Sequence, residues 1–526
     1  MTGFLPALPA SGPSARRAGR NSFLRSGLPS AVRTLLITAI PILGCPGTPA
    51  LAASADPFAI EQLTPGHPGS HGRGPEAAAQ DVCAQDLPTS PLSLRDVVDL
   101  ALCRNLQTRE AWAAARARAA DIGIVRATYL PSLIADVSAR RNEVDSAGIA
   151  RTGETTYRAE AAISWLLYDF GARDANLENA RQLLAAASAA QDNAVQAVFF
   201  SALQSFYGVH AREAALSATI EAERSSQQAL TAATVRQEVG TATPLDRLQA
   251  QTNHSQAVLD RIRAQGDLQA ARGVLANVLA LSPVQPLVLA TIRDAPPDDA
   301  NASTPENAEA SAQVADIGRL IEEASRRRPD LLAAEAEVRA AEAAIAAARA
   351  TGRPTVSLAA SAGVQDSSLG PATRSGSIGV NLTIPLFLGY EPTYRLRAAE
   401  ARADAQVALR DRIRLQVSLD VWRNYQALVT ATQAVRTSRD VVTSAEQAER
   451  VALGRYKAGV GNILDVLNAQ TALARSRQQA IQATFDRNIA RAALAQSTGG
   501  LDFDLLTRMN DTQLSPAPTQ SGDPTR

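Results

Sequence analysis

The chain contains one helix–turn–helix pattern twice, and this internal repeat constrains the fold more than any other feature of the sequence. Residues 236–251 and 455–470 share the pattern R-x3-G-x5-D-x3-A-Q. The offset between the copies, taken from Asp246 to Asp465, is 465 − 246 = 219 residues. The repeat indicates that the chain is a tandem duplication of about 220 residues.

Changes in composition divide the 526 residues further. The stretch between the copies is rich in proline, asparagine and acidic residues with little to bury, and the tail is rich in proline. The predicted segments are a signal peptide at 1–52, an extended segment at 53–91, a first repeat at 92–290, a linker at 291–316, a second repeat at 317–505 and a disordered tail at 506–526.

The signal peptide is predicted from the first 33 residues, which carry five arginines and no acidic residue. An apolar stretch follows, and Ala50-Leu51-Ala52 supplies a small-residue cleavage site. Ile42-Leu43-Gly44-Cys45 also resembles a bacterial lipoprotein box, so lipidation of Cys45 is the alternative processing route.

Helix breakers are far apart in both copies. Gly208 is the only one within 172–239. In the second copy the helix would begin at Pro392, which suits a first turn, and only Gly454 interrupts it before Ala458. At 1.5 Å per residue, each of these helices would be about 100 Å long. Small apolar residues recur at heptad-like spacing, so we expect the helices to pack as coiled coils rather than to stand alone in solvent. A shorter helix is predicted from about Leu94 to Thr128.

The hydrophobic period changes to two at 132–168 and at 355–387, which predicts one β-hairpin in each copy. Segments of about ten residues with one apolar and one polar face are typical of membrane strands. The alternative is two half-buried hairpins on a soluble domain. Strands in lipid must close into a barrel, and one chain supplies only four, so several copies would share it. A dimer would have eight strands, and a trimer would have twelve and room for a conduit.

Several function classes are excluded by the same sequence. Basic and acidic residues balance at 52 each, without the basic excess of a nucleic-acid-binding protein. The histidines form no ligand-like cluster, and no phosphate-binding loop or nucleophile elbow is present. We therefore expect neither an enzyme nor a cofactor. Methionine occurs only at positions 1 and 509, which disfavours a channel for soft metal ions.

These residues together resemble the TolC-type outer-membrane efflux and secretion proteins over nearly all of 92–505. The resemblance is carried by the duplicated turn, Tyr129-Leu130-Pro131-Ser132-Leu133, Arg328-Pro329-Asp330-Leu331 and Leu382-Thr383-Ile384-Pro385-Leu386-Phe387. Residues 100–112 further resemble the members that serve type I secretion of cyclolysin.

The resemblance implies a fold that is mainly α with membrane β. It implies a homotrimer with a twelve-stranded barrel in the bacterial outer membrane and a helical tunnel in the periplasm. The channel would be a passive conduit that works with a periplasmic adaptor (membrane fusion) protein and an inner-membrane ABC or proton-driven pump. The alternative function is a periplasmic coiled-coil adaptor or scaffold without a barrel.

The resemblance also implies that the tip turns, 240–244 and 459–463, form the periplasmic entrance. A tight reversal between helices often needs positive φ, which is the physical reason for Gly240 and Gly459 in these turns. The residues implied to dock the adaptor are Val239, Gly240, Thr241, Ala458, Gly459 and Val460, and those implied at the entrance are Asp246, Asp465, Asn468 and Tyr456. The sequence departs from the family pattern at Gln237, which corresponds to Tyr456, at Gly461, which replaces an arginine, and at Asn468, which replaces an acid. The family's tyrosine–arginine gate is therefore not carried over.

Two aspartates and two cysteines each allow two interpretations. Asp246 and Asp465 would either ring the opening and favour cations or stabilise helix N-termini through the helix dipole, and both roles are compatible. Cys83 and Cys103 would lie in an oxidising compartment, which predicts a disulfide between them, with free buried thiols as the alternative.

Overall fold

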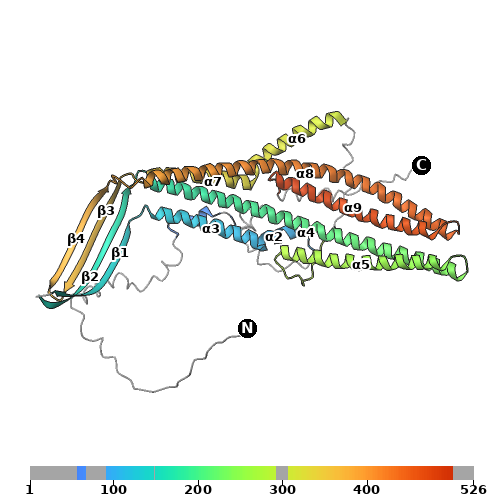
Figure 1. Ribbon diagram of the computed structural model, residues 1–526, viewed down its shortest axis with the longest axis horizontal. Coiled ribbons are helices and arrows are strands. Elements are labelled where there is room, and N and C mark those ends of the chain that lie inside the picture. Colours follow the sequence, from blue (N-terminus) through green and yellow to red (C-terminus); the bar gives the residue numbers. More distant parts are fainter. Residues whose placement is uncertain (1–55, 65, 67–90, 147–148, 292–305, 502–526) are drawn as a thin grey trace, which may run out of the picture. The chain divides into compact units, whose positions relative to one another are not determined.

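The computed structural model describes residues 56–64, 66, 91–146, 149–291 and 306–501. These residues form two compact units, which we call the sheet unit and the helical unit (Figure 1). The sheet unit contains β1 (Ser132–Ser146), β2 (Ile149–Tyr168), β3 (Thr355–Ser367) and β4 (Gly370–Thr383). The helical unit contains η1 (Ile60–Leu63), α2 (Leu94–Arg104), α3 (Leu106–Ala127), α4 (Ala172–Glu238), α5 (Pro244–Val278), α6 (Glu306–Arg327), α7 (Pro329–Ala350), α8 (Glu391–Lys457) and α9 (Ile463–Ser497).

The sheet unit joins the hairpins of the two copies into one antiparallel sheet with the order β1-β2-β3-β4. Val137 pairs with Ala159, which pairs with Val364, so apolar residues of neighbouring strands share one face. The predicted alternation is therefore confirmed. The strands are 13 to 20 residues long rather than about ten. β4 ends at Thr383 instead of 387, just before Pro385, which has no backbone N–H to donate to a ladder.

Within the part of the chain that the structure describes, two edges and one face of this sheet are uncovered. β1 and β4 each pair on one side only among the described strands. The large apolar side chains left exposed on the shared face include Leu133, Val137, Ile378, Val380 and Leu382. Open strand edges and exposed apolar surface are both unfavourable in water, so the sheet requires a partner along its edges and an apolar environment on this face.

The four long helices form two pairs of equal length, one member of each pair in each copy. α4 and α8 have 67 residues each, and α5 and α9 have 35 each. α4 packs on α5 and α8 packs on α9, and the two hairpins meet where α4 packs on α9 (Figure 1). Both 67-residue helices begin after a left-handed residue, Gly171 in the first copy and Tyr390 in the second. The predicted long helices are confirmed. No helix among the described residues is long and apolar enough to span a membrane.

The single helix predicted from Leu94 to Thr128 is wrong, because the chain breaks at Asn105. This residue is extended, with φ −61° and ψ 135°. Its Oδ1 accepts from Gln107 N at 2.9 Å and starts α3, while its Nδ2 donates to Val278 O at 3.0 Å. An asparagine that caps the next helix and anchors to α5 favours the break over a continuous helix.

The second copy breaks at the corresponding place. Arg328 is extended, with φ −65° and ψ 121°, and Pro329 is the first residue of α7. Proline lacks a donor and fits the first helical turn, so it favours a new start here. The side chain of Arg328 bonds Asp330 through Nε at 3.0 Å and through Nη2 at 2.6 Å, and it reaches Asp420 on α8 at 3.0 Å through Nη1. These ion pairs therefore attach the break between α6 and α7 to α8.

Two predicted boundaries also need correction. The linker 291–316 is too long, because α6 begins at Glu306. Alanine and glutamate are strong helix formers, and they are frequent from that residue onward. The segment 53–91 is not extended throughout, since η1 forms one turn and Arg126 Nη1 donates to Phe58 O at 2.7 Å.

Several predictions fall outside the described residues: the signal peptide 1–52, Cys45, Cys83, most of the linker and the tail 506–526. Cys103 is described. It is buried on α2, with 6% of its surface exposed, and it is disulfide-bonded. Its pairing with Cys83 stays a prediction.

Candidate functional site at the paired helical turns

Both hairpin turns are closed by the same backbone motif. Gly240 has φ +76° and Gly459 has φ +81°. After α8, Gly459 N donates to Tyr456 O and Val460 N donates to Arg455 O, both at 3.0 Å. The first copy repeats these bonds from Gly240 to Gln237 and from Thr241 to Arg236. This is a Schellman motif, whose left-handed position favours glycine, so the predicted need for glycine in each turn is confirmed.

The residues after the two turns start the return helices differently. Thr243 accepts from Asp246 N at 3.3 Å, and the Asp246 carboxylate accepts from Thr243 N at 2.9 Å. This reciprocal pair is a capping box. In the second copy the cap is Asn462, which accepts from Leu464 N at 3.2 Å, and Asp465 is exposed. Asp246 therefore caps the first return helix, a contact that Asp465 does not make in the second.

The turn residues form an exposed surface. Val239 and Val460 are 67% and 69% exposed, and Gly240, Thr241, Ala458 and Gly459 are exposed beside them. Asn468 is also exposed, on α9. Leu245 and Leu464, which follow the two turns, are 61% and 43% exposed. Together with the two valines they leave apolar surface available to a partner.

Tyr456 differs from the other predicted entrance residues because it is buried, with 3% of its surface exposed. It belongs to a small core at the tips, together with Ala229, Ala233, Ala250, Ile463 and Val466. The guanidinium carbon of Arg236 lies 4.7 Å from the centre of its ring, and Arg236 Nη1 donates to Tyr456 O. Burial raises the pKa of the Tyr456 hydroxyl, Arg236 opposes that rise, and Asp246 adds to it. This cation–π contact ties the end of α4 to the end of α8.

A second bridge, which we call the four-helix polar layer, lies on the same helices. Gln470 on α9 is 8% exposed and donates to Ser225 Oγ on α4 at 2.8 Å. Ser225 Oγ donates to Glu449 on α8 at 3.1 Å, and Asn253 on α5 reaches Gln470 Oε1 at 3.5 Å. Buried polar groups that satisfy each other fix the register of packed helices. The layer therefore joins all four long helices.

Arg236 and Gln470 were not predicted as site residues, although both belong to the duplicated pattern. The signal was present, because the arginine that begins the pattern and the glutamine that ends it are retained in both copies. Their roles depend on which helix lies opposite, and the repeat alone does not contain that information.

The chain matches the family described as Outer membrane efflux protein over residues 97–281 and 320–500, one stretch in each copy. The chain belongs to that family. It is 31% identical to Protein CyaE of Bordetella pertussis over 416 residues, which cover 78% of this chain and 84% of CyaE. It is 28% identical to outer membrane protein OprJ of Pseudomonas aeruginosa, covering 77% and 84% of the two chains.

A solved structure supports the same assignment of fold. A crystal structure of a membrane protein from Pseudomonas aeruginosa superposes with a TM-score of 0.66 at 26% identity and covers 79% of this chain and 99% of the other. Membership of the outer membrane efflux protein family confirms the predicted resemblance, the outer-membrane location and the transport function. The protein is a channel component and not an enzyme, and the adaptor alternative is not supported.

Proposed function

We propose that three copies of the chain form a passive conduit from the periplasm to the exterior. The support comes from the sheet, whose β1 and β4 edges have no partner among the described strands and whose apolar face is exposed. Three copies would supply twelve strands, which is enough to close the sheet around an open interior. The polar face carries Asp136, Glu160 and Arg158 and would line that interior.

We propose further that the conduit serves type I secretion or efflux together with a periplasmic adaptor and an inner-membrane ABC or proton-driven pump. The identity with CyaE and the cyclolysin-type segment at 100–112 favour secretion of a protein. The conduit itself would be passive, and the pump would supply the energy. The exposed valines at the two turns would form the docking surface for the adaptor.

The conduit is tested by incorporating purified, detergent-extracted protein into planar bilayers. We expect discrete single-channel conductance from a trimeric species identified by analytical ultracentrifugation. A monomer with intact strand content, or a trimer that never conducts, would contradict the proposal.

The docking surface can be tested through Lys457, which is the single lysine of the sequence and lies exposed beside the second turn. An amine-reactive cross-linker applied to cells that produce the channel and its adaptor should join the two proteins through this residue. Lys457→Arg keeps the charge and removes the primary amine, so it is the matched control and should lose the product. A cross-link of equal yield in the arginine variant would place the adaptor elsewhere.

The two aspartates near the turns should contribute unequally to ion selectivity. Asp246 is held in its capping box, whereas Asp465 is exposed. Asp465→Asn should therefore weaken cation preference in planar bilayers, while Asp246→Asn should mainly lose about 0.3–1 kcal/mol of helix-terminus stabilisation. Reversal potentials across a salt gradient measure the first effect, and thermal unfolding measures the second. If the cation preference is unchanged in Asp465→Asn, the role of Asp465 is purely structural.

A further inference from the structure

The polar face of the sheet carries its charges on one hairpin. On β3 and β4 this face presents only small or neutral residues, from Ser357 to Gln365 and from Thr373 to Asn381. Residues that lie opposite each other on neighbouring strands share a face, so the register assigns the charged residues of β1 and β2 to the same side. They are Asp136, Arg140, Glu154, Arg158 and Glu160. The duplicated hairpins therefore share a fold and differ in charge.

The charged side chains form successive rows across the first hairpin. Asp136 lies directly opposite Glu160, so the row nearer the strand ends that continue into helices is acidic. The next two rows toward the hairpin turn carry Arg158 and then Arg140. Consecutive rows on one face are two residues apart, which is about 7 Å along a strand. An acidic row and two arginine rows are therefore close neighbours on this face.

The second hairpin holds the charged side chains of β2 against the sheet. Arg158 donates to Gln365 Oε1 on β3, from Nη2 at 2.7 Å and from Nε at 3.3 Å. Gly363 lies opposite Glu160, and a Cβ on this glycine would come within 3.4 Å of Cβ and Cγ of the glutamate. The side chain of Glu160 therefore occupies the space that Gly363 leaves free. Neutral and small residues on β3 thus allow both charged side chains of β2 to lie along the wall.

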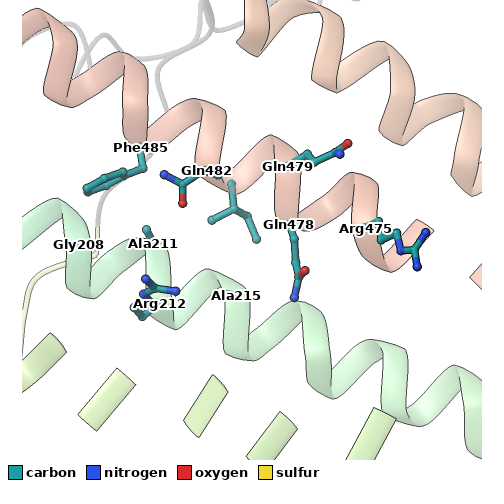
Figure 2. A pocket seen from close by; sticks show the side chains of 10 residues that line it. Gly208, Ala211, Arg212, Ala215, Arg475, Gln478, Gln479, Gln482 and Phe485 are labelled. Carbon is teal, nitrogen blue, oxygen red and sulfur yellow. The ribbon is translucent and has the colours of Figure 1, made fainter. Parts of the chain in front are cut away.

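A glycine of the helical unit has a different role. Figure 2 shows a groove between α4 and α9 that is lined by Gly208 and Phe485 among others. A Cβ on Gly208 would lie 4.0 Å from Phe485 Cε2, so this glycine accommodates an apolar contact between two helices. At Gly363 the space is taken by a charged side chain instead. The small residues of the second hairpin therefore serve the charge pattern of the sheet rather than the packing of two elements.

We infer that the β1–β2 hairpin alone sets the charge selectivity of the conduit within the sheet. In the proposed conduit, on which this inference rests, the polar face lines the interior. Carboxylates raise the local concentration of cations, and guanidinium groups raise that of anions. Because Asp136 and Glu160 lie in series with Arg158 and Arg140, the two effects oppose each other. The sheet therefore adds little net preference as long as both kinds of row are present, and loss of either kind reveals the other.

The rows are tested by reversal potentials of full-length trimers in planar bilayers across a gradient of potassium chloride. Arg158→Gln weakens the basic rows and should shift the reversal potential toward cation preference. Glu160→Gln weakens the acidic row and should shift it toward anion preference. Arg374→Gln is the matched control, because Arg374 lies opposite Val364 on the apolar face and should leave the reversal potential unchanged. Both shifts should shrink in about 1 M salt, where the Debye length is about 3 Å.

A thiol at the same position tests the charge within a channel that already conducts. In Arg158→Cys trimers, a methanethiosulfonate reagent with a quaternary ammonium group forms a disulfide with the thiol, releases methanesulfinate and restores a positive charge. It should return the reversal potential toward that of the unaltered channel. A reagent with a sulfonate group should move it further toward cation preference. The unsubstituted channel controls for reaction of its own cysteines.

The outcomes separate the charge rows from the conduit itself. Conducting trimers whose reversal potential is unchanged in both Arg158→Gln and Glu160→Gln would overturn the role of the hairpin and leave the conduit standing. A shift in Arg374→Gln as large as that in Arg158→Gln would overturn it as well, because charges on both faces would then act alike. A monomer, or a trimer that never conducts, would overturn the proposed function and the charge rows together.

Discussion

Replacing Gly459 by valine is expected to abolish export while outer-membrane trimers remain at normal abundance. Gly459 has φ +81° in the Schellman turn, a conformation that costs a residue with a Cβ about 1–2 kcal/mol and costs a β-branched residue more. The turn would therefore re-form with another shape, and Val460 and Lys457 beside it would move. The helices themselves are held by packing along α8 and α9, far beyond the last turn. Export into the medium and trimer yield in membrane fractions measure the two effects.

Two variants control for side-chain size and for position. Gly459→Asn adds a side chain that tolerates the left-handed region and should retain most export. Gly454→Val adds the same valine five residues earlier on α8, where a Cβ would meet nothing within 4 Å. It should export normally. Equal loss of export in Gly459→Val and Gly454→Val would show that the turn conformation is not the cause.

Replacing Arg328 by alanine is expected to lower thermal stability more than any other single change at the helix breaks. The arginine side chain is 16% exposed and pairs with Asp330 and Asp420, which are 27% and 29% exposed. Removing one partner of a buried ion pair leaves the other charge unpaired and lowers the free energy of unfolding by about 3–5 kcal/mol. Because both aspartates are partly exposed, we expect the lower end of this range, about 3 kcal/mol. At about 2.1 cal/mol/K of unfolding entropy per residue, the midpoint of thermal unfolding, followed by circular dichroism, should fall by roughly 3 °C.

The matched control is Arg326→Ala on the preceding turn. Arg326 pairs with Glu322, but the two side chains are 74% and 64% exposed. Exposed pairs contribute about 0–1 kcal/mol, so this variant should unfold at nearly the unaltered temperature. Equal shifts of the unfolding midpoint in the two variants would mean that the contact from Arg328 to Asp420 on α8 does not stabilise the protein.

The features that the sequence predicted correctly are those that depend on neighbouring residues. The 67-residue helices follow from the absence of breakers, the strands from a period of two, and the positive φ of Gly240 and Gly459 from the need to reverse the chain in a few residues. The duplication predicted that each of these elements occurs twice. Local dihedral preferences and periodic side-chain patterns determine all of them.

Tertiary structure alone decided the features that depend on a residue distant in sequence. Asn105 breaks a helix because Val278 accepts its side-chain amide, and Gln470 is buried because Ser225 lies opposite it. Corresponding residues of the two copies have equal local propensity, yet Gln470 is buried and Gln251 is exposed. The physical reason is that burial and hydrogen bonding are set by the side chains on the helix that lies opposite, and the repeat does not specify which helix that is.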